Sequence, residues 1–376
     1  MLVRPFKKQM INKGVRSFAS ATHIPVPSRP RDASVSVCPG EGAGPQLIDA
    51  VLEIFDYMKV PLNTEMIDYS SLKRGQENES LKKNNWLLLG PVSNKSYEDE
   101  GRGICHTQIL KELETYASIV NPISIPGAET NGKDIDLLII QQTDHGFQSD
   151  YPQTAEYDDV SSMWIMPFKK SNKIAEYAFG NATMGKRSKV SAFHQANIFK
   201  ECHGEFLMNT RKIAKDTKDI KYEEMYLGEA ATKLARDPEA FDLIVMPHNC
   251  GDIVSSIAFS TVGGEGMVPS VHIGDKHSVF QQGGTNPNYQ SANEGNANPT
   301  GMILSASMML RQANLPSFAD LLEAAVFDTY KNSDVRTSEL GGNYSTKEFT
   351  EQVMKNIRMK PSQKSQLQKD SVSLEM

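Results

Sequence analysis

Apolar and polar residues follow one another along the chain in blocks that predict strands followed by helices. Residues 34–38 (SVSVC) form a short strand candidate, and a glycine-rich turn comes directly after it. Beyond the turn, apolar residues recur at helical spacing, which predicts one buried face of a helix that begins near Pro45. These positions are Leu47, Val51, Ile54 and Met58.

Later blocks repeat this alternation of strand and helix. Residues 135–140 and 241–246 are short apolar runs that are typical of buried strands and too short for free-standing helices. Residues 302–310 are apolar nearly all round, which predicts a helix inside the core or at an interface between subunits. Residues 321–326 continue with an amphipathic helical pattern, and we find no internal repeat and no low-complexity linker. The order predicts an α/β fold with a doubly wound or related sheet.

Composition and charge narrow the possible classes of function. The 376 residues suffice for one large domain or two coupled ones. A net charge of −6 argues against a general nucleic-acid binder, and no apolar run is long enough to predict a membrane span. The four cysteines are scattered without a CxxC pair, which indicates reduced thiols in a non-secreted protein.

The two ends of the chain differ from the blocks between them. Residues 1–31 carry seven lysines and arginines and no acid, which predicts a mitochondrial transit peptide and a location in the mitochondrial matrix. The alternative is a disordered basic tail. Residues 359–376 are polar without a strong apolar period, so we expect a disordered tail.

The glycine-rich turn at residues 39–45 (PGEGAGP) invites a nucleotide-binding interpretation. Glycines between a strand and a helix let a backbone approach a phosphate, and the N-terminus of a helix favours anions. The spacing is GxGxG followed by proline, however, and not GxGxxG, and no GK[ST] follows. By itself the segment predicts a turn into a helix, with nucleotide binding as the alternative.

Several ordered segments carry a resemblance to one enzyme family. Residues 39–45 resemble its PGDGIGPE opening, and residues 241–255 resemble FDVLVTPNLYGDILSD. Further similar segments are 113–118 (LDLYAN in the family), 192–198 (HKAN), 262–270 (VGGLGLAPS), 297–300 (ANPT) and 340–350 (LGG and EFT). The chain from residue 34 onward is thereby similar to the β-decarboxylating isocitrate and isopropylmalate dehydrogenases. The length of the loop at 279–300 best suits the regulatory, non-catalytic subunits of mitochondrial NAD-dependent isocitrate dehydrogenase.

The resemblance implies an isocitrate/isopropylmalate dehydrogenase-like α/β fold, with mixed twisted sheets flanked by helices. It implies a large domain from residues 32–130 and 271–358, and a small domain with a dimer clasp from residues 131–270. The cleft between the two domains would hold the site. Residues 302–310 would then lie in the core and not at the interface.

The family binds the carboxylates of isocitrate with three arginines, and this chain has none at those places. The matching residues are Leu110, Val120 and Gln141. Because charge-assisted hydrogen bonds contribute roughly 1.5–3 kcal/mol each, the loss of three predicts over a thousandfold weaker binding. Arg102 and Lys111 are nearby, but neither stands at a matching position.

The family's proton-transfer residues are replaced as well. Gln148 stands in place of a tyrosine and Gln195 in place of the HKAN lysine, and neither amide titrates at a useful pH. His194 and His145 are the nearby alternatives, because histidine titrates near neutrality. His194 belongs to the family's sequence pattern, so we favour a structural role for it.

The resemblance also implies NAD and a Mg²⁺ or Mn²⁺ ion, and the residues for both are depleted. Asp252 is retained as a metal ligand, or alternatively as a helix N-cap. Ser256 and Gly228 stand where the family has further aspartates. For the nucleotide, Asn298 matches the asparagine of ANPT. Gly283 and Gly284 lie in a loop that lacks the histidine and aspartate of the family's HGTAPDIAG segment, so a bound nucleotide would serve redox chemistry or regulation.

In this family the HKAN lysine and the metal-binding aspartate at the position of Gly228 enter the site of the neighbouring subunit. Gln195 and Gly228 therefore predict that this chain impairs the site of a catalytic partner. The first interpretation is a non-catalytic subunit in a hetero-oligomer with a catalytic subunit, with a homodimer as the alternative assembly. The alternative functions are an active oxidoreductase on a less charged substrate, and a repurposed protein without a ligand.

Overall fold

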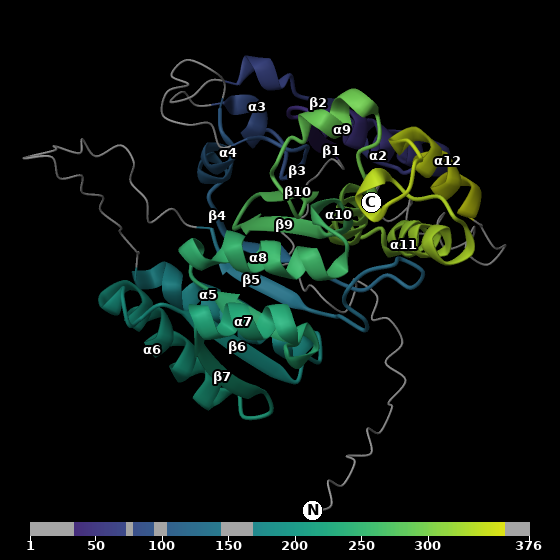
Figure 1. Cartoon of the computed structure of the whole chain (residues 1–376). Helices are drawn as coiled ribbons and strands as arrows, with labels where there is room; N and C mark the ends of the chain where they lie inside the picture. The colour runs from purple at the N-terminus through teal and green to yellow at the C-terminus, as the bar shows by residue number, and fades with distance from the viewer. Residues whose placement is uncertain (1–33, 73–77, 94–103, 144–167, 358–376) are drawn as a thin grey trace, which may run out of the picture.

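The computed structural model describes residues 34–72, 78–93, 104–143 and 168–357 (Figure 1). They form an α/β fold around one ten-stranded sheet of order β2-β1-β3-β10-β9-β4-β5-β8-β6-β7, which confirms the predicted fold class. The predicted leader, the C-terminal tail, and Arg102, His145 and Gln148 lie outside the described residues.

The first third of the chain builds one edge of the sheet. Strand β1 (Ser34–Cys38) leads into helix α2 (Gly44–Met58), as the sequence pattern predicts. Strands β2 (Asn63–Met66) and β3 (Trp86–Leu89) pair with β1 on either side, both parallel to it. The short elements η1 (Tyr69–Ser71), α3 (Glu79–Lys82) and α4 (His106–Glu112) complete this part.

The middle of the sheet is antiparallel and joins segments far apart in sequence. Strand β4 (Thr115–Val120) pairs with β5 (Leu138–Gln142) and with β9 (Pro269–Gly274), and β9 pairs with β10 (Ser278–Gln282). Strand β10 then runs parallel to β3. The sheet is therefore mixed, and it is a single sheet where the family resemblance implied several.

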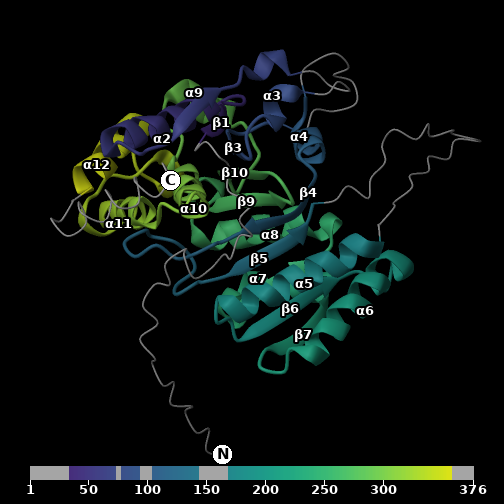
Figure 2. The same ribbon diagram turned by 180° about the vertical axis from the view of Figure 1, so that it is seen from behind.

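The other edge of the sheet is parallel and covered on both faces. Strands β8 (Leu243–Met246), β6 (Lys189–His194) and β7 (Lys221–Tyr226) extend it. Helices α5 (Phe168–Met184) and α6 (Lys200–Asp216) lie on one face. Helices α7 (Leu227–Arg236) and α8 (His248–Val262) lie on the other, as a comparison of Figures 1 and 2 shows.

The C-terminal helices form the main core with the centre of the sheet. Helix α10 (Thr300–Gln312) packs on β9 and β10, and residues 302–310 are all buried within this one chain. That placement confirms the core interpretation. Helix α11 (Pro316–Asn332) packs against α10 and α12 (Thr346–Asn356), and α12 packs against α2. The remaining short elements are η2 (Pro238–Ala240), η3 (Glu265–Met267), α9 (Tyr289–Glu294) and η4 (Ser338–Leu340).

Two further expectations concern the membrane and the thiols. Among the described helices, none combines the length and the apolar character that crossing a membrane requires. All four cysteines are free thiols in the structure, as expected.

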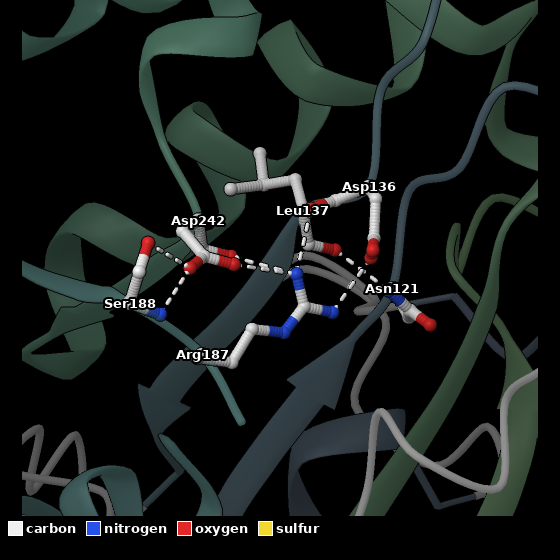
Figure 3. A network of polar contacts seen from close by, with 6 residues as sticks. All are labelled: Asn121, Asp136, Leu137, Arg187, Ser188 and Asp242. Atoms are coloured by element: carbon white, nitrogen blue, oxygen red, sulfur yellow. Dashed lines mark hydrogen bonds and ion pairs between the residues drawn. The ribbon is translucent and has the colours of Figure 1, made fainter. Parts of the chain in front are cut away.

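Strands β5 and β8 begin later than the apolar runs indicate, because a buried arginine binds the backbone carbonyls of the residues just before them. Arg187, whose side chain is fully buried, pairs with the carboxylates of Asp136 (2.7 Å) and Asp242 (2.9 Å) (Figure 3). Its Nη1 also donates to the carbonyls of both aspartates, and Ser188 donates to Asp242. Strand β5 therefore starts at Leu138 and not at 135, and β8 starts at Leu243 and not at 241.

This network predicts a pH-dependent stability. Burial by itself raises the pKa of Asp242, but hydrogen bonds and the charge of Arg187 outweigh it and hold that pKa below its ordinary value. The stabilisation is therefore present above the pKa of the unfolded state, near 3.9, and is lost as pH falls through the lower folded-state pKa. Urea unfolding of Asp242→Asn and the native chain should show a difference in stability at about pH 7 that shrinks once the pH falls below about 4. An exposed control, Asp216→Asn, should show little difference at either pH.

Candidate functional site

A cavity of about 400 Å³ gathers most of the candidate site residues. Helix α4, strands β4, β5, β9 and β10, helix α8 and the loop after β10 contribute to its wall. Figure 1 shows α8 running alongside β9 and β5. The candidates that line the cavity are Leu110, Val120, Gln141, Asp252, Ser256, Gly283 and Gly284. Positions as far apart in the sequence as Leu110 and Gly284 thus meet at one place.

The wall of the cavity where the sequence resemblance predicts the family's arginine clamp is uncharged. Leu110 on α4, Val120 on β4 and Gln141 on β5 are 4%, 3% and 7% exposed. The amide oxygen of Gln141 packs against Gly251, where a Cβ atom would come within 1.6 Å of it. Among the described lining residues there is no lysine and no arginine. This wall offers no positive charge to a carboxylate.

Helix α8 presents Asp252, Ser255, Ser256 and Phe259 to the cavity. Asp252 lies in the second turn of the helix, and Ser256 follows it by one turn. The N-cap position belongs to Pro247, so the alternative interpretation of Asp252 as an N-cap is wrong. The sequence could not show this, because the helix begins four residues before Asp252 without a capping side chain.

The described residues do not fit a divalent metal ion. Octahedral Mg²⁺ or Mn²⁺ needs several oxygen ligands from carboxylates. Asp252 has only the Ser256 hydroxyl one turn away, and the described part of the chain contains no group of three or more histidine, cysteine, aspartate or glutamate side chains able to hold a metal. A single carboxylate is insufficient to hold such an ion.

Three histidines in the cavity wall were not singled out from the sequence: His106, His248 and His272. His106 Nε2 lies 2.9 Å from Oε1 of Gln281, and the rings of His106 and His272 meet edge to face at 5.3 Å. Burial lowers the pKa of His106, which favours its neutral form. The available signal was the alternation of Ser270 and His272 with apolar residues in β9, which marks a polar face.

Gln195 and Gly228 lie outside this cavity, at the parallel edge of the sheet. Oε1 of Gln195 accepts a long hydrogen bond from Asn249 (3.4 Å), and its backbone N–H donates to His203 (2.8 Å). Gly228 lies in the first turn of α7, and a Cβ atom there would meet nothing within 4 Å. Packing therefore does not require a glycine at this position.

A second hollow, of about 590 Å³, lies next to these two positions. His194, Ala196, Arg211, Tyr226 and Glu229 are among the residues that line it. Nδ1 of His194 accepts from the backbone of Ala196 (3.2 Å), and its ring packs on Tyr226 at 4.9 Å. Burial lowers the pKa of His194. These contacts favour the structural role over proton exchange.

Two of the three candidate nucleotide-binding residues line the main cavity, and the third does not. Gly283 and Gly284 line the main cavity, and a Cβ atom on Gly284 would come within 2.1 Å of the Glu265 carboxylate. Asn298 is 5% exposed and does not line the cavity; its Oδ1 accepts from the backbone of Thr300. The structure thus brings the two glycines to the cavity and leaves Asn298 out of its lining.

The glycine-rich turn before α2 is used for packing. The backbone N–H of Ala43 donates to the carbonyl of Pro287 (2.7 Å), and that of Glu41 donates to Pro91 (2.8 Å). Gly42 has a φ of +58°, and a Cβ atom there would come within 2.1 Å of the Pro287 carbonyl. These donors are occupied by the chain itself, which favours the turn interpretation over phosphate binding.

Gly42→Ala should therefore destabilise the fold. The left-handed conformation and the approach of Pro287 predict a loss of roughly 1–3 kcal/mol in the free energy of unfolding. Gly204→Ala is the control, because Gly204 lies in α6 with open space around it. Denaturant unfolding of both variants measures the effect, and equal stabilities would contradict the packing role.

Comparison with known proteins places these observations in a family. The family profile described as isocitrate/isopropylmalate dehydrogenase matches residues 34–353. The chain is 33% identical to isocitrate dehydrogenase [NAD] regulatory subunit 2, mitochondrial, of Arabidopsis thaliana, covering 92% of this chain and 97% of the relative. It is 34% identical to the human mitochondrial subunit alpha, covering 86% and 90%. The crystal structure of isocitrate dehydrogenase from Methylococcus capsulatus superposes with a TM-score of 0.80 at 25% identity, covering 87% of this chain and 99% of that one.

Proposed function

Because the chain belongs to the isocitrate/isopropylmalate dehydrogenase family, we propose that it is a non-catalytic subunit of a mitochondrial NAD-dependent isocitrate dehydrogenase. The observation that carries the proposal is the uncharged wall of Leu110, Val120 and Gln141 in the cavity. The similarity to regulatory and alpha subunits supports the enzyme class, and it does not by itself decide between a regulatory and a catalytic subunit.

The loss of isocitrate binding follows from electrostatics. Three carboxylates brought into a cavity leave water, and fixed positive charges must replace that hydration. Here the described wall supplies neutral side chains instead, and Asp252 and Glu265 add negative charge. The normal substrate pose is therefore unfavourable before any chemical step is considered.

For the metal ion and NAD, too, the proposal depends on which residues could hold the ligand. Because Asp252 belongs to no metal-binding group of side chains within the described residues, we propose that this subunit holds no metal by itself. We keep Asn298, Gly283 and Gly284 as candidate contacts for NAD, in a regulatory role. The relatives are named as mitochondrial proteins, and we propose the matrix, with residues 1–31 as the transit peptide.

We propose a catalytic subunit of the same family as the partner, in a hetero-oligomer. The hollow beside Gln195 and Gly228 exposes large apolar side chains, among them Met208 (59% exposed) and Tyr226 (53%). Exposed apolar groups that gather near one surface are typical of an interface. We also propose the division into a large domain (32–130 and 271–358) and a small domain (131–270), with the site between them.

Co-expression of this chain with a tagged catalytic subunit, followed by purification, tests the proposal. We expect a stoichiometric complex that Tyr226→Lys weakens. Tyr57→Lys is the matched control, since Tyr57 on α2 is similarly exposed (52%) but lies away from the hollow. No complex with the native chain would contradict the assembly and favour a homodimer or a repurposed protein.

The second candidate function is an active oxidoreductase on a less charged substrate. The neutral wall favours it, because an uncharged substrate would meet no missing clamp. NAD reduction with 2-hydroxy acids that carry fewer carboxylates would separate this candidate from the first.

A further inference from the structure

The sheet presents a row of uncharged polar side chains to the cavity beside α8. Gln141 of β5 stands opposite Ser118 of β4, and Ser118 stands opposite His272 of β9. Opposite residues of antiparallel strands carry their side chains on one face, with Cβ atoms about 5 Å apart. All three residues line the cavity and are at most 7% exposed. This row, the polar floor of the cavity, therefore places an amide, a hydroxyl and an imidazole next to one another.

Much of the hydrogen-bonding capacity of the cavity wall is not used by the fold. Several hydroxyls of the lining make no hydrogen bond to another described residue, namely those of Ser118, Ser255, Ser256 and Thr285. Oε1 of Gln141 has no hydrogen-bond partner among the described residues either. Ser255 and Gln141 are 4% and 7% exposed, and buried polar groups without partners cost free energy. Because hydroxyls and amides can both donate and accept, the wall favours a ligand whose groups do both.

The charges of the lining do not favour an ionic ligand. The described lining has no lysine or arginine, and burial lowers the pKa of His106, which favours its neutral form. An anion would find only neutral donors, with the carboxylates of Asp252 and Glu265 in the same wall. A cation could pair with one of these carboxylates, but its N–H groups would leave the protons of the free hydroxyls without an acceptor. An uncharged ligand with hydroxyl groups can donate to a carboxylate and accept from the serines.

We propose that this cavity binds a small polyol, an uncharged molecule with several hydroxyl groups on a short carbon chain. Its hydroxyls hydrogen-bond to the polar floor and to the free hydroxyls of α8, and its carbon atoms pack on Leu110, Val120 and Phe259, which also line the cavity. The volume of about 400 Å³ lies in the range of small-molecule sites. The inference rests on the proposed function, because a cavity that still bound isocitrate would be a site for an anion.

Ligand-observed NMR titration of the full chain with four-carbon probes tests the inference. Erythritol carries four hydroxyl groups and 1,4-butanediol carries two, whereas succinate carries two negative charges and putrescine two positive charges. We expect saturable binding of erythritol with a Kd below about 10 mM, and binding of each other probe that is at least about threefold weaker. The comparison with 1,4-butanediol isolates the contribution of the additional hydroxyl groups.

Two variants test whether erythritol binds in the cavity. Ser118→Ala removes a hydroxyl of the polar floor, and Asp252→Asn replaces a charged acceptor by a neutral one. Each should weaken erythritol binding by about three- to tenfold. Ser260→Ala is the matched control and should leave binding unchanged, because Ser260 is exposed on α8 and is not among the lining residues. Circular dichroism of each variant checks that it is folded.

Three results would overturn the inference. They are tighter binding of any other probe than of erythritol, no saturable binding of erythritol, and an erythritol affinity that both cavity variants leave unchanged. An isocitrate-dependent NAD reduction assay on the same preparation separates this inference from the proposed function. Turnover contradicts the proposed function, whereas no turnover together with no erythritol binding contradicts the polyol site alone.

Discussion

Replacing Arg187 by methionine should lower the free energy of unfolding by about 3–5 kcal/mol. The guanidinium has no exposed surface and joins Asp136 and Asp242 at the starts of β5 and β8. Removing it takes the guanidinium from both carboxylates and from both backbone carbonyls, and Asp242 keeps the hydrogen bonds from Ser188 and Leu138. Unpaired buried charges are costly, so the loss exceeds that of the ion pairs themselves.

Arg211→Met is the matched control for this prediction. Arg211 makes a bidentate pair with Glu224, but half of its side chain is exposed. Exposed pairs contribute about 0–1 kcal/mol, so urea unfolding should separate the two variants clearly. Similar losses in both would show that Arg187 acts as an ordinary surface pair.

A one-to-one heterodimer of this chain with an intact catalytic subunit should turn over isocitrate at least about a hundredfold more slowly per catalytic site than the homodimer of that subunit. The family resemblance implies that a lysine and an aspartate enter the neighbour's site. This chain carries Gln195 and Gly228 at those positions, beside the hollow with the exposed apolar residues. An amide and a hydrogen atom can neither transfer the proton nor bind the metal.

Restoring the two groups provides the complementary experiment. Space around Gly228 is open, so Gly228→Asp together with Gln195→Lys should raise the turnover of the heterodimer without loss of stability. Gln290→Lys, at an exposed position on α9, is the control. Full turnover by the native heterodimer would contradict the prediction.

The regular helices and strands were predictable because the spacing of their apolar residues decides which face of each element is buried. Helices α2 and α10 and strand β1 follow directly from periodicity. The starts of β5 and β8 were not predictable, because Arg187 reaches them from a distant segment and occupies the polar groups before each strand.

The site was predictable only in part. The family resemblance singled out Leu110, Val120, Gln141 and Asp252, and the structure brings these residues to one cavity. The histidines were missed, because His106 on α4 and His272 on β9 are far apart in sequence and their rings meet only in the folded chain. Glu265 was missed for a similar reason, since its carboxylate reaches Gly284 from a separate turn. Charge within a cavity depends on which segments meet there, and a single sequence pattern does not report that.

The central claim is that this chain does not bind isocitrate, and titration calorimetry of the purified chain with isocitrate and Mg²⁺ tests it most directly. With the clamp positions occupied by Leu110, Val120 and Gln141, we expect no saturable heat up to about 1 mM isocitrate. Saturable binding with a micromolar Kd would contradict the account.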